Sequence, residues 1–200
     1  MKLIIASNNA HKVREIREIL EDFFPDMQTL KQAGLSIDVE EDGDTFAANA
    51  KKKAEETLLA APGFDAALAD DSGLMVDHLN GAPGVYSARY AGEQHCDADN
   101  NAKLMADMAG VPDDQRGCQF VACIALARRG KPTITATGIV RGRLLCEAVG
   151  ENGFGYDPYF FYEPAGLSFA QIAPEEKNAV SHRHNALILM KEMLEKEQQA

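Results

Sequence analysis

Residues 67–77 read Ala-Leu-Ala-Asp-Asp-Ser-Gly-Leu-Met-Val-Asp, and the rest of the chain is organised around them. Two short apolar runs, Ala66 to Ala69 and Leu74 to Val76, flank an acidic segment that Gly73 closes. This pattern predicts a strand, a turn and a second strand, with two adjacent carboxylates at the edge of a sheet. Neighbouring residues of an extended chain point to opposite sides. We therefore expect one of Asp70 and Asp71 to face a site, where it can hold a metal, and the other to be tied into the scaffold.

The same four residues, Asp-Asp-Ser-Gly, are also ordinary turn chemistry, because Asp and Ser bond their own backbone and Gly permits positive φ. Taken alone they leave both interpretations open. The choice between them depends on the remaining chain.

The composition is that of an ordinary globular protein. The chain has 200 residues, of which 46% are hydrophobic and 26% charged, enough for one sizeable core or two tightly joined lobes. The formal net charge is -11, which argues against a non-specific partner such as nucleic acid or an anionic membrane. An anionic ligand must therefore meet a local cluster of Lys, Arg or metal.

Cysteine usage and hydropathy point to a cytoplasmic protein. Cys96, Cys118, Cys123 and Cys146 form no CxxC pair and have no nearby His at zinc spacing. Reduced thiols are the simplest interpretation. The apolar run from Leu3 to Ala6 is too short for a signal sequence or a membrane span, and no later run comes close to the required length. We expect neither secretion nor membrane insertion.

The N-terminal segment predicts a strand, a polar loop and a helix. The strand covers Lys2 to Ala6, the loop reads Ser7-Asn8-Asn9-Ala10-His11-Lys12, and the helix runs from about His11 to Asp22. A helix N-terminus and Lys12 are favourable for an anion. The glycines of a P-loop are absent, and a plain strand-to-helix connection capped by Ser and Asn is the simpler explanation of the loop alone.

A second acidic segment, residues 40–44, follows a strand expected at Ser36 to Glu40. Asp44 or Thr45 then caps a helix that runs to about Ala61. Carboxylates here can contribute to a Mg²⁺ site, although a solvated turn at a helix N-terminus explains the segment just as well. The run Lys51-Lys52-Lys53 on this helix directs at most one or two ammonium groups to any one site.

The second half predicts a hairpin and a glycine-rich aromatic loop. The hairpin pairs Cys118 to Arg128 with Thr133 to Val140. In the loop, glycines on both sides of Phe154 allow close approach to a flat ligand, although an aromatic turn over the core remains an alternative. Ser181 caps the last helix, with His182 and cations in its first turn, which favours an anionic or carbonyl-bearing ligand there.

Taken together, these stretches resemble the family of inosine/xanthosine triphosphate pyrophosphatases. Each stretch is weak evidence alone, but their order and spacing match the family over nearly the whole chain. The matching stretches are the first strand with its loop 7–12, Glu41 before Thr45-Phe46, residues 69–73, residues 81–84 with 86–90, residues 153–158, Glu176-Lys177 and Ser181-His182-Arg183.

The resemblance implies an α/β fold with an elongated mixed β-sheet flanked by helices, and two lobes with an active-site cleft between them. It implies one domain over residues 1–200 and a homodimer. It also implies a Mg²⁺-dependent cut between the α and β phosphates of non-standard purine nucleoside triphosphates (ITP, dITP and XTP), which releases a monophosphate and pyrophosphate and cleanses the nucleotide pool.

The resemblance also implies roles for individual residues. Asp71 is the candidate general base for the attacking water, and Glu41 and Asp71 serve the metal. Phe154 stacks on the base. The substrate-binding residues that it implies are Ser7, Asn8, Asn9, Ala10, His11, Lys12, Lys53, Ser72, Phe154, Gly155, Tyr156, Asp157, Lys177, His182 and Arg183. Among these, Ser7, Asn9, Lys12, Lys53 and Ser72 hold the triphosphate, while Asp157, Lys177, His182 and Arg183 line the base pocket.

The first loop departs from the family's common Thr-Gly-Asn-x-(Gly/Asn)-Lys form. Ser7 stands for Thr, Asn8 for Gly, and His11 for the small or amide residue before Lys12. Ser keeps the hydroxyl, and Asn tolerates left-handed φ better than most residues. Two alternatives remain. One is a related pyrophosphatase for other modified nucleotides, and the other is a non-catalytic nucleotide-binding protein. The presence of Asp71, Glu41 and Lys12 argues against the non-catalytic protein.

Overall fold

The structure is a computed structural model that describes residues 1–92 and 96–199, apart from the side chain of His11. Its strands are β1 (Lys2–Ile5), β2 (Asp26–Thr29), β3 (Ala66–Val76), β4 (Gly117–Arg128), β5 (Lys131–Leu144), β6 (Phe160–Tyr162) and β7 (Leu167–Ser168). Its α-helices are α1 (Ala10–Leu20), α2 (Phe46–Ala60), α3 (Asp97–Asp107), α4 (Pro174–Val180) and α5 (His182–Gln199). Short 3₁₀ helices cover Asp77–Leu79, Gly84–Arg89, Asp113–Gln115 and Asp157–Tyr159.

The strands form one mixed sheet, which confirms the predicted α/β class. Seven strands are hydrogen-bonded in the order β2-β1-β3-β4-β5-β6-β7. β1 pairs in parallel with β2 and with β3, whereas β6 pairs antiparallel with β5 and with β7. The predicted hairpin is present as β4 and β5, which Arg129 and Gly130 connect. Among the described helices, none has the length and apolar run that crossing a membrane requires.

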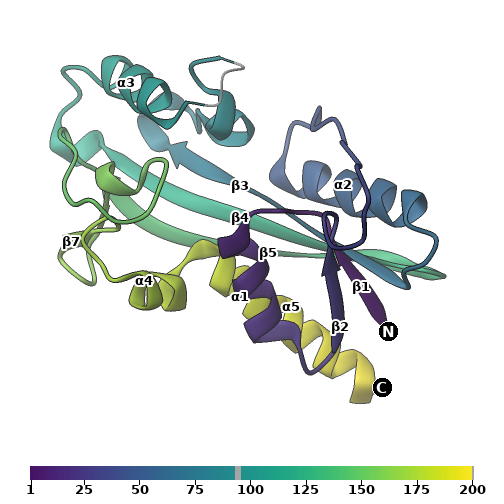
Figure 1. Ribbon diagram of the computed structural model, residues 1–200. Helices are drawn as coiled ribbons and strands as arrows, with labels where there is room; N and C mark the ends of the chain where they lie inside the picture. The colour runs from purple at the N-terminus through teal and green to yellow at the C-terminus, as the bar shows by residue number, and fades with distance from the viewer. Residues whose placement is uncertain (93–95, 200) are drawn as a thin grey trace. The chain divides into compact units, whose positions relative to one another are not determined.

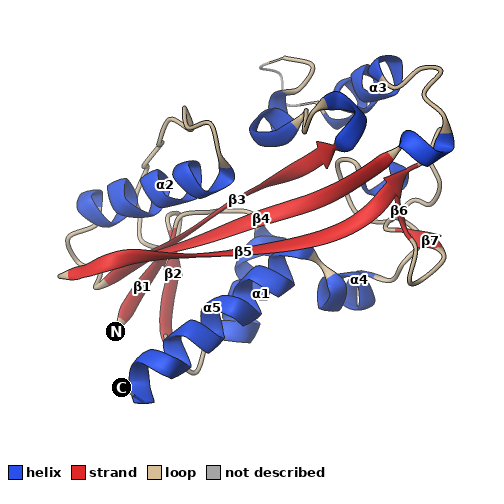
Figure 2. Ribbon diagram, turned by 180° about the vertical axis from the view of Figure 1, so that it is seen from behind, coloured by secondary structure: helices blue, strands red, loops and turns tan. Residues whose placement is uncertain are grey.

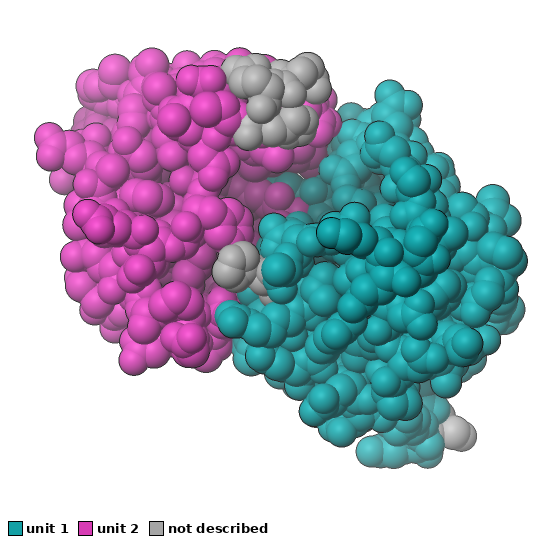
Figure 3. All heavy atoms as spheres, viewed as in Figure 1, with its two compact units in different colours: residues 1–71, 122–138, 183–200 teal, residues 72–121, 139–182 magenta. Residues whose placement is uncertain are grey.

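The chain groups into two compact units, coloured separately in Figure 3. Unit 1 contains residues 1–71, 122–138 and 183–200, and unit 2 contains residues 72–121 and 139–182. The strands β3, β4 and β5 contribute residues to both units.

The core of unit 1 lies between its strands and two helices. In Figures 1 and 2, α1 and α5 lie side by side on one face of these strands, and α2 covers the other face. Ile16 of α1 and Leu187 of α5 pack with Leu3 and Leu68 in one buried cluster. Full burial of such an aliphatic side chain stabilises the fold by about 1.5–3 kcal/mol relative to exposure. The helical spacing of the apolar residues in α1 therefore produces this packing.

The core of unit 2 is more aromatic. Phe120, Phe160 and Phe169 are buried together, with ring centroids 4.6–5.9 Å apart. Leu74 of β3 and Leu104 of α3 belong to the same cluster. The short strands β6 and β7 thus close one edge of this core.

The prediction of a turn at residues 70–73 is wrong, because β3 runs unbroken from Ala66 to Val76. Gly73 does not have positive φ. Instead, a Cβ atom at Gly73 would lie 2.2 Å from Ser87 Oγ and 2.6 Å from the Gly84 carbonyl oxygen. Glycine at position 73 therefore allows the segment that contains Gly84 and Ser87 to pack closely against β3.

The prediction of a strand at Ser36 to Glu40 is also wrong, and β2 at Asp26–Thr29 was not predicted. Residues 36–40 alternate in burial as a strand would, but they pair with no strand in the described part of the chain. β2 is short and polar, and its strand conformation depends on parallel pairing with β1. Local sequence pattern alone does not reveal that partner.

Candidate active site

The candidate site of unit 1 lies at the carboxyl end of β1, where the order of the parallel strands reverses. β1 lies between β2 and β3, and the connecting helices α1 and α2 cover opposite faces. The Ala6 N–H donates to the Leu68 carbonyl at 2.8 Å, so the loop after β1 lies beside the segment of β3 that carries Asp70 and Asp71. Open α/β sheets bind ligands at such a reversal.

Asp70 is fully engaged on the α1 and α5 side of the sheet. Lys12 of α1 makes an ion pair with Asp70 Oδ1, and Arg183 Nε donates to Oδ2 at 3.0 Å. The second carboxylate near this arginine is Glu15, with 3.5 Å between Nη1 and Oε2. Burial by itself raises the pKa of Asp70, but the charges of Arg183 and Lys12 outweigh it and hold the pKa well below its usual range. Asp70 is therefore a buried, ionised scaffold residue.

Asp71 has a different environment, because its partner comes from α2 on the opposite face. Asn49 Nδ2 donates to Asp71 Oδ2 at 3.0 Å. Burial raises the pKa of Asp71 to about 6; the Asn49 hydrogen bond opposes this shift, and the negative charges of Glu41 and Asp70 add to it. A carboxylate with a pKa near neutrality is suited to general-base catalysis. The expectation that the two carboxylates point to opposite sides is confirmed.

The acidic segment 41–43 is held by α2. Lys53 pairs with Glu41, Lys52 Nζ lies 2.6 Å from Asp42 Oδ1, and Asn49 Oδ1 accepts from the Gly43 N–H at 2.7 Å. Among the residues that the structure describes, no group of three or more His, Cys, Asp or Glu could hold a metal ion. A metal site here would rest on Glu41 and Asp71, with further oxygen ligands from water and substrate.

The loop after β1 is fixed by its own side chains. Ser7 Oγ accepts from the Asn9 N–H at 3.2 Å, and Asn9 Oδ1 accepts from the Lys12 N–H at 3.2 Å. Asn8 Oδ1 accepts from the Lys31 N–H at 3.1 Å. The predicted residue Ala10 opens α1, and the side chain of His11 lies outside the described residues. The loop thus caps α1 through short-range hydrogen bonds.

In unit 2 the glycine-rich loop presents an aromatic ring. The side chain of Phe154 is 51% exposed, and Lys177 Nζ lies 5.0 Å from the ring centroid. Asp157 is buried; its Oδ2 accepts from the Phe154 N–H at 2.9 Å and pairs with Lys177. Gly153 has φ 78°, and a Cβ there would lie 2.1 Å from Asp157 Oδ2. The glycine therefore allows the buried carboxylate to hold the loop.

The same loop is anchored to α3 through the backbone of Gly155. Asp97 Oδ2 accepts from the Gly155 N–H, and Asn101 Nδ2 donates to the Gly155 carbonyl oxygen, each at 2.9 Å. The buried Tyr156 donates its hydroxyl to the Ser87 carbonyl oxygen at 2.7 Å. Tyr156 is therefore a packing residue, whereas Phe154 is the large hydrophobic residue that this loop exposes.

The remaining predicted residues of unit 2 are Ser72 and His182. Ser72 follows Asp71 on β3 and is partly buried. His182 is the first residue of α5, and its ring stacks on Phe120 with 5.0 Å between the centroids. The aromatic core of unit 2 thus orients the imidazole.

The comparisons with known proteins agree with one another. A sequence model of the Ham1 family matches residues 3–193. The chain belongs to the Ham1 family. It is 49% identical over 197 residues to a dITP/XTP pyrophosphatase from Clostridium perfringens, covering 96% of this chain and 97% of that protein.

Two solved structures are similar over almost the whole chain. The Ham1 protein of Staphylococcus aureus has a TM-score of 0.90 at 38% identity, over 98% of this chain and 100% of that one. A structure from Mycobacterium abscessus, described as a nucleoside-triphosphatase and dITP/XTP pyrophosphatase, has a TM-score of 0.80 at 39% identity, over 95% and 98%. The resemblance inferred from the sequence is thereby confirmed.

Within this Ham1 fold, unit 1 brings together the loop 7–12, Lys53, Glu41 and Asp71, and unit 2 brings together Phe154, Asp157 and Lys177. Arg183 belongs to unit 1, where Asp70 and Glu15 engage its buried guanidinium. Arg183 thus stabilises the buried carboxylates of Asp70 and Glu15.

Sequence reasoning missed Asn49, Asp97, Asn101 and Glu15. A usable signal existed for Asn49, which is a polar residue among alanines on the helix face that carries the buried Phe46, Ala50 and Ala54. A polar side chain on such a face requires a hydrogen-bond partner. Asp97 and Asn101 have no comparable signal, because their partner is a backbone group far along the chain.

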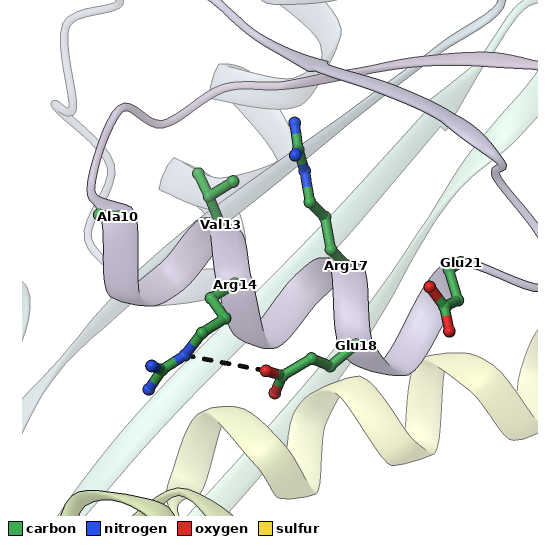
Figure 4. Close-up of a pocket in the computed structure, with 6 residues that line it drawn as sticks. All are labelled: Ala10, Val13, Arg14, Arg17, Glu18 and Glu21. Atoms are coloured by element: carbon green, nitrogen blue, oxygen red, sulfur yellow. Dashed lines mark ion pairs between the residues drawn. The ribbon is translucent and has the colours of Figure 1, made fainter.

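A separate open pocket follows the outer side of α1 (Figure 4). It is lined by Ala10, Val13, Arg14, Arg17, Glu18 and Glu21. Arg14 and Glu18 form an exposed ion pair of 3.8 Å, and Arg17 donates to the Met27 carbonyl and to Gln32. The two arginines and two glutamates that line this pocket balance one another in charge. This part of the Ham1 fold therefore does not favour a polyanionic ligand.

Proposed function

We propose that this protein hydrolyses non-standard purine nucleoside triphosphates, namely ITP, dITP and XTP, to the monophosphate and pyrophosphate. Membership of the Ham1 family, with relatives described as dITP/XTP pyrophosphatases, supports the substrate class. The proposed chemistry rests on the two adjacent carboxylates of β3. Cations compensate Asp70, whereas the pKa of Asp71 is raised.

Asp71 is the general base in this mechanism. It accepts a proton from the water that attacks the α-phosphorus, while the bond from that phosphorus to the bridging oxygen breaks and its electron pair leaves with pyrophosphate. Asn49 orients the carboxylate through Oδ2, so that the base is held in one position. Asp70, the residue before Asp71 on β3, stays ionised and fixes the positions of Lys12 and Arg183.

The phosphates are bound by unit 1. The N-terminus of α1 offers backbone N–H groups, and Ser7, Asn9, Lys12 and Lys53 add polar or cationic side chains. A triphosphate brings about four negative charges to a chain of net charge -11, so local cations are necessary for binding.

Mg²⁺ is the proposed cofactor, and Glu41 with Asp71 are its proposed protein ligands. Their oxygen donors fit the ion, since Mg²⁺ is commonly bound by one or two carboxylates together with water and substrate phosphates. Asn49 bonds both to Asp71 and to the Gly43 N–H, two residues after Glu41, which supports placing the two carboxylates at one ion. When bound, the ion supplies charge neutralisation for the phosphates.

The base is recognised by unit 2. The exposed ring of Phe154 offers a stacking face, and Lys177 is a donor beside it. His182, which stacks on Phe120, is the second donor proposed for the base in this unit. Hypoxanthine and xanthine carry a carbonyl acceptor at position six, whereas adenine carries an amino donor. A pocket edged by donors therefore accepts the first two and rejects adenine.

Two further features belong to the proposal. A homodimer is supported by the family resemblance and is tested by light scattering of the purified protein. A cytoplasmic site of action follows from the proposed substrates, which belong to the nucleotide pool.

Product analysis tests the proposed reaction. Incubation of the protein with ITP and Mg²⁺ is expected to yield IMP and pyrophosphate, resolved by anion-exchange chromatography, and the Asp71→Asn variant serves as the control for contaminating activity. Formation of IDP and phosphate, or equal turnover by the variant, would contradict the proposal.

A further inference from the structure

One helix holds both acidic segments of unit 1. Asn49, Lys52 and Lys53 of α2 contact Gly43, Asp42 and Glu41, respectively. Of these three residues, Asn49 alone also bonds to β3, through Asp71. It is therefore a direct side-chain link between the segment that carries Glu41 and the strand that carries Asp71.

The side chain of Asn49 is suited to this link because an amide is both donor and acceptor. Its Nδ2 donates to Asp71 Oδ2 at 3.0 Å, and its Oδ1 accepts from the Gly43 N–H at 2.7 Å. The residue is 1% exposed, so neither bond competes with bulk water. A carboxylate at this position has no donor for Asp71 at neutral pH, and an aliphatic side chain has neither group.

The approach of the acidic segment to Asn49 requires glycine at position 43. A Cβ atom there would lie 2.7 Å from Asn49 Oδ1 and 3.0 Å from Ala48 Cβ. The backbone of the segment therefore lies directly against α2, and Lys53, one helical turn after Asn49, reaches Glu41 from the same helix.

We propose that Asn49 is a positioning residue, which fixes the orientation of Asp71 and its spacing from Glu41 so that both carboxylates can bind one divalent cation. This inference rests on the proposed function, because it assigns the two carboxylates to the metal. Asn49 bonds to Oδ2 of Asp71, which allows Oδ1 to turn toward a ligand. Partners of this kind commonly set metal affinity by about 10- to 100-fold.

The test measures Mn²⁺ binding by the intact protein without nucleotide, using electron paramagnetic resonance of free Mn²⁺. Asn49→Ala and Asn49→Leu are compared with wild type; leucine keeps the core filled if alanine fails to fold. The matched control is Lys52→Gln, which removes another contact from the same helix to the same segment but does not touch Asp71. We expect Mn²⁺ binding about 10- to 100-fold weaker in the Asn49 variants and near wild type in the control.

Two further measurements separate positioning from a general structural role. The Mg²⁺ concentration for half-maximal activity is expected to rise at least about tenfold in the Asn49 variants, with much of kcat restored by excess Mg²⁺. In an Asp71→Asn background, Asn49→Ala is expected to cause no additional loss of Mn²⁺ binding, since it acts through Asp71.

Folded Asn49 variants that bind Mn²⁺ as tightly as Lys52→Gln would overturn the inference. The inference would also be overturned if Asn49→Ala weakened Mn²⁺ binding further in the Asp71→Asn background. A wild-type protein that binds no Mn²⁺ would overturn it as well. Because this titration needs no nucleotide, it is independent of the product test. Weakened Mn²⁺ binding in a protein that leaves ITP, dITP and XTP intact would support the inference and refute the proposed function.

Discussion

At the scale of single residues, the adjacent carboxylates Asp70 and Asp71 acquire opposite properties from the strand that carries them. Lys12 and Arg183 compensate Asp70 on one face of the sheet, while Asn49 bonds Asp71 on the other. The alternation of side chains along an extended chain predicts this division. The sequence alone does not predict that Arg183 approaches from a helix more than a hundred residues away.

Replacement of Asp71 by Asn should leave the fold intact and abolish most of the activity. The variant keeps the size of the side chain but loses the proton acceptor and a charged metal ligand, so we expect kcat for ITP to fall by about 10²–10³-fold. Steady-state kinetics at saturating Mg²⁺, with circular dichroism to confirm folding, measure the effect. Turnover near that of wild type would exclude Asp71 as the base.

Replacement of Arg183 by Ala should act mainly on stability. It leaves the buried carboxylates of Asp70 and Glu15 without their shared cation, which typically costs about 3–5 kcal/mol. Urea unfolding measures the change. Arg14→Ala is the matched control, because its ion pair with Glu18 is exposed and contributes about 0.5 kcal/mol or less.

The alternative role of Arg183 in the base pocket makes a different prediction. If the guanidinium contacted the base, Arg183→Ala would narrow the ratio of kcat/KM for ITP to that for ATP while stability changed little. A stable variant with altered base selectivity would therefore contradict the supporting role that its contacts with Asp70 and Glu15 indicate.

At the scale of secondary-structure elements, the long helices and the β4–β5 hairpin follow from sequence pattern. Thr45 caps α2 as expected, since its Oγ1 accepts from the Ala48 N–H at 3.1 Å. The failure at residues 70–73 has a physical cause: Asp, Ser and Gly favour turns, but here burial and tertiary partners keep them in a strand. Such partners are distant in sequence and cannot be recognised from local composition.

Replacement of Gly73 by Ala tests this explanation of β3. An added Cβ would lie 2.2 Å from Ser87 Oγ and 2.6 Å from the Gly84 carbonyl oxygen, so we expect a loss of about 1–3 kcal/mol in the free energy of unfolding. Gly63→Ala is the control, because a Cβ added at Gly63 would have no neighbour within 4 Å and the φ of Gly63 is not in the left-handed region. Equal stability of the two variants would show that Gly73 does not accommodate a close approach.

At the scale of the whole molecule, an ion pair joins the end of α5 to the β4–β5 hairpin within unit 1. Arg128 contacts both carboxylate oxygens of Glu197, at 2.6 and 2.8 Å, and Lys131 lies 3.3 Å from Oε2. The hydrogen bond from Arg128 is the main cause that lowers the pKa of Glu197 to about 2. The carboxylate is partly exposed, so screening limits its contribution to about 1 kcal/mol.

Glu197→Gln should therefore have a pH-dependent effect on stability. The folded pKa lies below the unfolded value of about 4.3, so the stabilisation is fully present above that value and is lost as pH falls toward 2. Urea unfolding of wild type and variant should differ by up to about 1 kcal/mol at pH 7 and by less at pH 3. A difference that is unchanged between these pH values would contradict the assignment.

Membership of the Ham1 family was predictable from the order and spacing of short motifs, because those motifs occur together over nearly the whole chain. The contacts that hold the site residues in place were not predictable from the sequence. Asn49, Asp97 and Asn101 act on Asp71 and on the backbone of Gly155, and these partners are brought near only by the fold. The residues that orient a site are harder to identify from sequence than those expected to contact the substrate.

Whether this protein selects non-standard purine nucleotides is decided by kcat/KM for dITP, XTP and ITP against dGTP and dATP, with Mg²⁺, in one assay that detects pyrophosphate. We predict that dITP, XTP and ITP are preferred over dATP by about 10⁴-fold, since the six-carbonyl meets a donor that the adenine amino group cannot pair with. Equal rates for dATP and dITP, or no pyrophosphate from any of the five, would contradict it.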